Sequence, residues 1–141
     1  MTETSVRTPA TTTGLRWASG LFAIALLVHG ADHFRRGMGS ISTTVMTLGS
    51  LQTALALVTI ALVFAGHRWA PPAAIGIGFA SAIGFTLVHL FPDWFGPFSD
   101  SFIDPPADAG VTGFSWFAAI FEVIADLLIG FAGLRAFRRS R

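Results

Sequence analysis

The stretch FSWFAAIFEVIADLLIGFAGLRAF, residues 114–137, decides the fold of this chain. A helix needs about 20 mostly apolar residues to cross a bilayer, because all its backbone polar groups must be hydrogen-bonded within the segment. This stretch is long enough, and its two acids, Glu122 and Asp126, interrupt the apolar pattern without ending it. It therefore predicts a membrane-spanning helix that carries two ionisable side chains.

Three more apolar stretches of similar length come earlier in the chain, at residues 15–34, 41–66 and 71–91. Only 12% of the 141 residues are charged, about half the share that is usual in a soluble domain. Short links join the first stretch to the second and the second to the third, which makes these neighbours antiparallel. The sequence therefore predicts one all-α domain over residues 15–137, a four-transmembrane-helix bundle with up-down-up-down topology.

The segments outside these stretches predict how the bundle lies in the membrane. Residues 1–14 predict a disordered tail, residues 92–113 an outer loop, and residues 138–141 a basic tail. Arginine and lysine are enriched in the cytoplasmic segments of membrane proteins. If both termini are cytoplasmic, only Arg35 and Arg36 of the 9 basic residues lie outside. We therefore expect cytoplasmic N- and C-termini.

Ionisable residues inside the apolar stretches are costly and mark candidate functional sites. His29 and His33 are one helical turn apart, a spacing that helical metal ligands use. His89 lies near the end of the third stretch, and Glu122 lies inside the fourth, with Asp126 one turn further on. We expect these five side chains to line one pocket that opens outward.

A divalent transition metal fits such a group of side chains. The chain has no cysteine, so imidazoles and carboxylates are the ligands available to Zn, Fe or Cu(II). The predicted metal ligands are His29, His33, His89 and Glu122. Haem is a weaker alternative, because only His29 and His89 could form an axial pair. Proton binding by the same groups is a further alternative, since histidine titrates near neutral pH.

Three other polar residues are predicted to hold protons or to support the site. Asp32 can pair with Arg35 or Arg36 on its own helix, or it can orient a histidine. Asp126 lies behind Glu122. Gln52 either joins two helices by a hydrogen bond or belongs to the pocket. The aspartates of the outer loop are expected to be solvated.

Small residues predict where helices approach each other closely. In the third stretch they recur every four positions, at Gly76, Ala80 and Gly84. Gly130 and Gly133 are expected to serve the same purpose in the fourth stretch.

Three segments resemble the pattern of small, uncharacterised four-span integral membrane proteins of actinobacteria: VHGADHFRRG (28–37), HLFPDWFGPFSDSF (89–102) and SWFAAIFEVIA (115–125). The resemblance implies a bacterial cytoplasmic (inner) membrane, and it assigns no activity or catalytic residue. Two further functions stay open: an accessory or assembly subunit of a larger membrane complex, and a small cation or proton transporter that acts as a homo-oligomer. No motif of an enzyme is present. The lipid bilayer is the expected partner, and the arginines do not form the basic face that nucleic acid requires.

Overall fold

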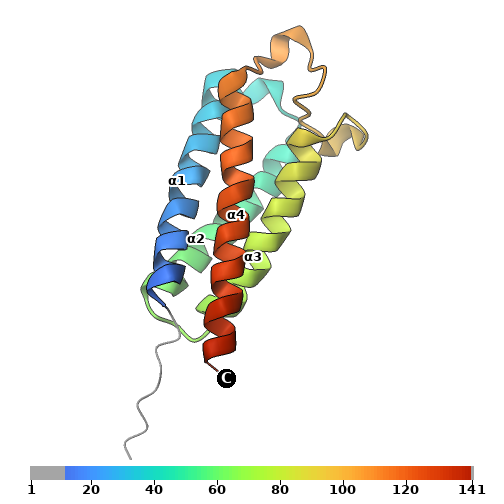
Figure 1. Ribbon diagram of the computed structural model, residues 1–141. Helices are drawn as coiled ribbons and strands as arrows, with labels where there is room; N and C mark the ends of the chain where they lie inside the picture. Colours follow the sequence, from blue (N-terminus) through green and yellow to red (C-terminus); the bar gives the residue numbers. More distant parts are fainter. Residues whose placement is uncertain (1–11, 141) are drawn as a thin grey trace, which may run out of the picture.

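Four long helices lie side by side in the computed structural model, which describes residues 12–140 and contains no strand over that range (Figure 1). Successive helices run in opposite directions, so the predicted four-helix bundle with up-down-up-down topology is confirmed. The last helical turn of α3 passes directly into a π-helical segment, η2. The elements are α1 (Thr13–Arg36), α2 (Thr43–Phe64), α3 (Ala70–Phe85), η2 (Thr86–Leu90) and α4 (Gly113–Arg139).

Each of the four helices is long and apolar enough to cross a membrane, with α3 and η2 counted as one span of 21 residues. Large apolar side chains also cover the outside of the bundle, including Leu27, Phe34 and Phe131. A soluble monomer rarely exposes apolar patches of this extent. These features indicate an integral membrane protein.

The helix ends lie within two residues of the expected spans. α1 begins at Thr13, which places the last two residues of the predicted N-terminal tail inside the helix. The side chain of Thr12 starts it by accepting the N–H of Leu15 at 3.2 Å. α4 continues through Arg139, so the first half of the predicted basic tail is also helical. The disorder predicted for residues 1–11 falls outside the described residues.

Glycine, serine and proline determine where the helices end and begin. Gly37 ends α1 with a φ of 88°, and its N–H donates to the carbonyls of His33 and Phe34. Ser42 caps α2 by accepting the N–H of Val45 at 3.2 Å. Prolines occupy the first turn of α3, where a backbone N–H would have no partner within the helix.

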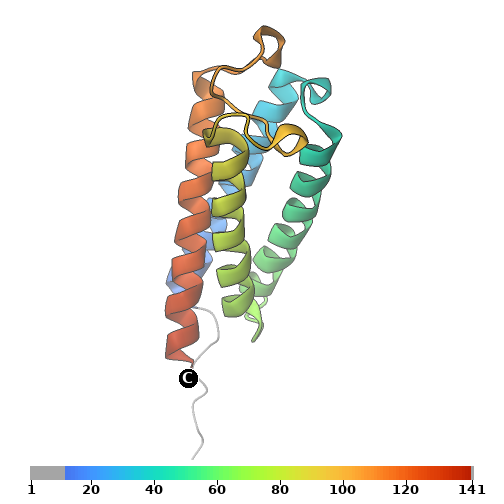
Figure 2. The same cartoon turned by 90° about the vertical axis from the view of Figure 1, so that its right-hand side faces the viewer.

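The hydrophobic core that all four helices share lies near the α2–α3 turn. Toward the opposite end of the bundle α2 diverges from α3, as the view in Figure 2 shows. The shared core therefore packs tightly at one end only. Its buried members are Leu15, Phe22, Ala56, Val63, Ala70, Ala74, Ile129 and Ala136.

The close contact between α3 and α4 uses a different face of α3 from the predicted one. A Cβ atom at Gly78 would lie 2.6 Å from the carbonyl oxygen of Asp126 and 2.6 Å from the backbone nitrogen of Gly130. An added Cβ at Gly76 or Gly84 would meet no atom within 4 Å. The predicted contact of α3 through Gly76, Ala80 and Gly84 is therefore wrong. Gly76 and Gly78 point in directions about 200° apart around the helix, so they cannot share a contact face. Gly130 lies in the contact, as predicted.

Residues 91–112 cover the end of the bundle where α3 stops (Figure 1). The carbonyls of Val88 and His89 accept the N–H groups of Asp100 (3.0 Å) and Phe102 (2.9 Å). Carbonyl groups in the last turn of a helix have no hydrogen-bond partner within the helix, and here the N–H groups of the loop are their partners. Short 3-10 turns complete the connections: η1 (Met38–Ser40), η3 (Gly96–Phe98) and η4 (Ala107–Ala109).

Candidate metal centre

Three histidines from two spans form a cluster beneath the loop-covered end of the bundle. His29 and His33 lie on α1, and His89 lies in η2. One ligand nitrogen from each ring lies within 4.8 Å of the other two. Zn–N bonds of about 2.0–2.1 Å in a tetrahedral site set ligand nitrogens about 3.3 Å apart. Modest side-chain rotations would therefore bring all three imidazoles onto one ion.

Two of the three histidines, His29 and His89, are buried among aromatic rings. The exposed fractions of His29 and His89 are 6% and 2%. The ring centroid of His29 lies 4.7 Å from that of His33 and 4.9 Å from that of His89. Phe85 packs edge-on against His29, with the ring centroids 4.7 Å apart. Such a water-poor environment strengthens the electrostatic attraction between imidazole ligands and a cation.

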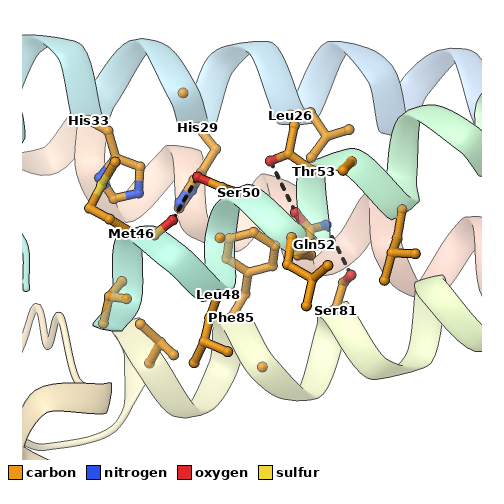
Figure 3. A pocket seen from close by; sticks show the side chains of 18 of the residues that line it. Leu26, His29, His33, Met46, Leu48, Ser50, Gln52, Thr53, Ser81 and Phe85 are labelled. Carbon is orange, nitrogen blue, oxygen red and sulfur yellow. Dashed lines mark hydrogen bonds between the residues drawn. The ribbon is translucent and has the colours of Figure 1, made fainter. Parts of the chain in front are cut away.

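The two imidazoles of α1 are short of hydrogen-bond partners. In the described structure neither ring nitrogen of His29 has a partner, and Nδ1 of His33 has none either. Most buried polar groups in proteins are hydrogen-bonded, and leaving one unsatisfied costs about 1–3 kcal/mol. Figure 3 shows both rings extending from α1 into the space between the helices. These nitrogens are therefore available to a ligand.

His89 is oriented by the outer loop. Its Nδ1 lies 3.0 Å from the carbonyl oxygen of Asp100, and only a protonated Nδ1 can donate to a carbonyl. Nε2 then carries the lone pair that a metal ion needs. Histidine ligands commonly donate their other N–H group to a carbonyl or a carboxylate, and π-helical turns are frequent at functional sites. This geometry favours His89 as a ligand through Nε2.

Asp100, expected to be a solvated loop residue, is buried, so that expectation is wrong. Its carboxylate accepts two hydrogen bonds from the guanidinium of Arg36, at 2.7 and 2.6 Å. Nε of Arg36 also donates to the carbonyl of Ala109 at 2.9 Å. The pair holds the loop segment whose carbonyl orients His89. Nothing in the local sequence signals this contact, because the two residues lie 64 positions apart.

Asp32 pairs with Arg35, one of the two partners predicted for it, at 2.8 Å. The hydroxyl of Ser115 on α4 donates to the same carboxylate oxygen at 3.0 Å. Arg35 also donates to the carbonyl of Gly110, at 2.8 Å. Over residues 12–140, the hydrogen bonds of Asp32 join α1 to α4 and none reaches a histidine. The orienting role predicted for Asp32 as an alternative belongs instead to Asp100.

Glu122 and Asp126 are fully buried on α4, but neither belongs to the histidine cluster. Within the described part of the chain, neither carboxyl group has a hydrogen-bond partner. Measured along the helices from the Asp32–Ser115 contact, Glu122 lies about 10 Å into the bundle and His29 about 5 Å. The structure thus places Glu122 in a separate, deeper polar layer rather than at the predicted position of a fourth ligand.

Gln52 joins α2 to α3, which is one of the two roles predicted for it. Its Nε2 donates to the hydroxyl of Ser81 at 3.0 Å (Figure 3). Both side chains also line the pocket between these helices. Gln52 therefore combines the two roles that the sequence left open.

A pocket of about 670 Å³ lies between α1, α2 and α3, where α2 diverges from α3, and all three histidines line it. Ala80 and Gly84, which were predicted to press against another helix, instead border this pocket, where their small size leaves space. Glu122 and Asp126 do not line it. Its other walls are mainly apolar and include Leu26, Met46, Leu48, Leu51, Ile77 and Phe85.

Comparison with known proteins leaves the function to be argued from the site itself. No protein-family model matches the sequence, and no curated protein or solved structure matches it significantly.

Proposed function

We propose that this chain is an integral membrane protein that binds one divalent transition-metal ion through His29, His33 and His89. The observation that carries the proposal is a trio of ligand nitrogens within 4.8 Å of one another, from two buried histidines and one half-buried histidine. Zn²⁺ is the leading candidate, because three histidines with one open position form a recurrent zinc site, and Cu²⁺ and Fe²⁺ also accept imidazole. A bound ion would supply Lewis acidity at the open position. The close packing of His29 against His89 argues against a haem plane between them.

Metal titration of the purified protein tests the proposal. After treatment with EDTA, isothermal titration calorimetry with Zn²⁺ in mild detergent should show one equivalent bound. His29→Ala and His89→Ala should each weaken binding at least 100-fold. His67→Ala is the matched control, because the fourth histidine lies in the α2–α3 turn and outside the cluster. Absence of binding to the unaltered protein, or an equal loss in His67→Ala, would contradict a metal site.

The proposed orientation places both termini in the cytoplasm of a bacterial cell. The distribution of arginines supports this orientation, and the resemblance to actinobacterial membrane proteins supports the bacterial membrane. Because the chain has no cysteine, single cysteines at exposed positions report the topology directly. A membrane-impermeant maleimide should label Asp108→Cys in intact cells and Ser140→Cys only after permeabilisation. The reverse pattern would overturn the orientation.

A second candidate function is proton or cation binding within the membrane, and the deeper polar layer supports it. Glu122 and Asp126 are one turn apart, fully buried, and without a hydrogen-bond partner in the described structure. Intramembrane acids of this kind are characteristic of ion and proton pathways. In proteoliposomes with an internal pH-sensitive dye, Glu122→Gln and Asp126→Asn should abolish proton flux. Flux in both variants equal to that of the unaltered protein would reject this function.

A further inference from the structure

We infer that the pocket between α1, α2 and α3 binds a long-chain amphipathic molecule whose oxygen-donor head group occupies the metal's open coordination position. The inference rests on the proposed metal site and names the class of ligand that the site receives. The shared chemistry is an apolar chain that ends in an oxygen donor. Two sources fit it: the carboxylate of a fatty acid and the carbonyl of a lipid-soluble quinone.

The size and shape of the pocket suit such a chain. Its volume of about 670 Å³ falls within the range of about 300–1,000 Å³ that is typical of small-molecule sites. On α2 the lining extends from Val45 to Leu57. At 1.5 Å per residue this distance is about 18 Å along the helix. The pocket therefore runs along the helices as an elongated space rather than as a compact cavity.

The polar groups of the pocket indicate which end receives the head group. Halfway along, Gln52 donates to Ser81, so each of these side chains already has a partner. The hydroxyl of Ser50 donates to the carbonyl of Met46 at 2.8 Å. At the loop-covered end, the described structure leaves both ring nitrogens of His29 and Nδ1 of His33 without partners. A polar head group would therefore bind most favourably at the histidine end of the pocket.

The wall formed by α2 provides a way in from the bilayer. Leu48, Leu51 and Leu55 line the pocket, yet their exposed fractions are 48%, 58% and 51%. These side chains therefore face both the pocket and the outside of the bundle. The loop and the Arg36–Asp100 pair cover the end of the bundle above the histidines. An amphipathic molecule dissolved in lipid would thus enter sideways, past α2.

Spectroscopy of a bound Co²⁺ ion tests whether a head group reaches the metal. The full-length protein in phosphatidylcholine nanodiscs is loaded with Co²⁺, and its visible absorption is recorded during ligand titrations. Saturable spectral changes are expected with palmitate if the source is a carboxylate, or with decylubiquinone if it is a quinone. Acetate, which lacks the chain, and hexadecane, which lacks the head group, should cause no change at the same concentrations. No response to either long-chain ligand overturns the inference.

A matched pair of glycine variants tests whether the chain occupies the pocket. Gly84→Leu fills the pocket and should weaken the binding of the long-chain ligand about tenfold, while Co²⁺ binding stays unchanged. Both glycines lie on α3, and neither has an atom within 4 Å of an added Cβ. Gly76→Leu should leave both affinities unchanged, because Gly76 does not line the pocket.

The outcomes separate this inference from the metal proposal. Failure of the protein to bind Co²⁺ contradicts the metal site itself. Normal Co²⁺ binding combined with no ligand-induced spectral change, or with equal ligand affinity in Gly84→Leu and the unaltered protein, contradicts only the occupancy of the pocket.

Discussion

Over the described residues, the buried carboxylates at the loop-covered end of the bundle have partners, whereas the two in its middle do not. At the end, Arg36 pairs with Asp100, and Asp32 accepts hydrogen bonds from two neighbours. In the middle, over the described residues, Glu122 and Asp126 are buried without any partner. Paired groups fix the structure, while an unpaired buried group lowers stability unless a ligand or a proton compensates it. The contrast therefore separates two layers. Arg36, Asp100 and Asp32 form a structural layer of paired groups, and Glu122 and Asp126 form a middle layer that is available for function.

Removing one partner from the structural layer should have the largest effect on the free energy of unfolding. Arg36→Met leaves the buried carboxylate of Asp100 uncompensated, which should lower the free energy of unfolding by about 3–5 kcal/mol. Unfolding in mixed detergent–SDS micelles measures this loss. The double variant Arg36→Met/Asp100→Leu should regain most of it, because neither charge then remains. A loss below about 1 kcal/mol in the single variant would show that the pair is not a main support of the loop.

The close contact of α3 and α4 lies beside the middle layer, at the backbone of Asp126. Gly78→Ala would place a Cβ atom 2.6 Å from the carbonyl oxygen of Asp126 and should destabilise the protein by about 1–3 kcal/mol. Gly76→Ala, on the open face of the same helix, should be neutral or stabilising by up to about 1 kcal/mol. Equal effects of the two substitutions in the same unfolding assay would mean that α3 does not press on α4 at Gly78.

Substitution in the middle layer should change stability in the opposite direction. Glu122→Met keeps a similar side-chain volume and removes an unsatisfied polar group, so it should stabilise the protein by about 1–3 kcal/mol. Asp32→Leu is the contrasting control, because it removes an acid that has partners and should destabilise. Thermal unfolding followed by circular dichroism compares the two variants. Destabilisation by Glu122→Met would show that this carboxyl group has a stabilising partner after all.

The sequence predicted the fold and the histidine cluster because both depend on short-range periodicity. The length of the apolar stretches defines the spans, and a separation of four residues puts His29 and His33 on one helical face. Two spans that run in the same direction also bring His89 to the same end of the bundle. These features place the three histidines at one end of the bundle, while the meeting of their rings also depends on how α1 and α3 rotate about their axes.

The rest of the site depends on contacts that no local pattern encodes. Whether Glu122 reaches the histidines is decided by the rotation and depth of α4, which its apolar sequence does not specify. The partnership of Asp100 with Arg36 needs a loop fold that brings together residues 64 positions apart. The pocket exists because α2 diverges from α3, and the apolar side chains of α2 do not concentrate on one face, so no periodic pattern predicts the position of this helix.

The smallest effect is expected at the hydrogen bond that joins α2 to α3. Gln52→Leu should lower the free energy of unfolding by about 0.6 kcal/mol, the average for interhelical hydrogen bonds in a membrane protein. A double-mutant cycle with Ser81→Ala isolates this bond, and the two single losses should not add. A coupling well above 1 kcal/mol would mean that this one bond largely holds α2 in place. The shape of the pocket would then depend on the hydrogen bond between Gln52 and Ser81 rather than on the apolar packing of α2.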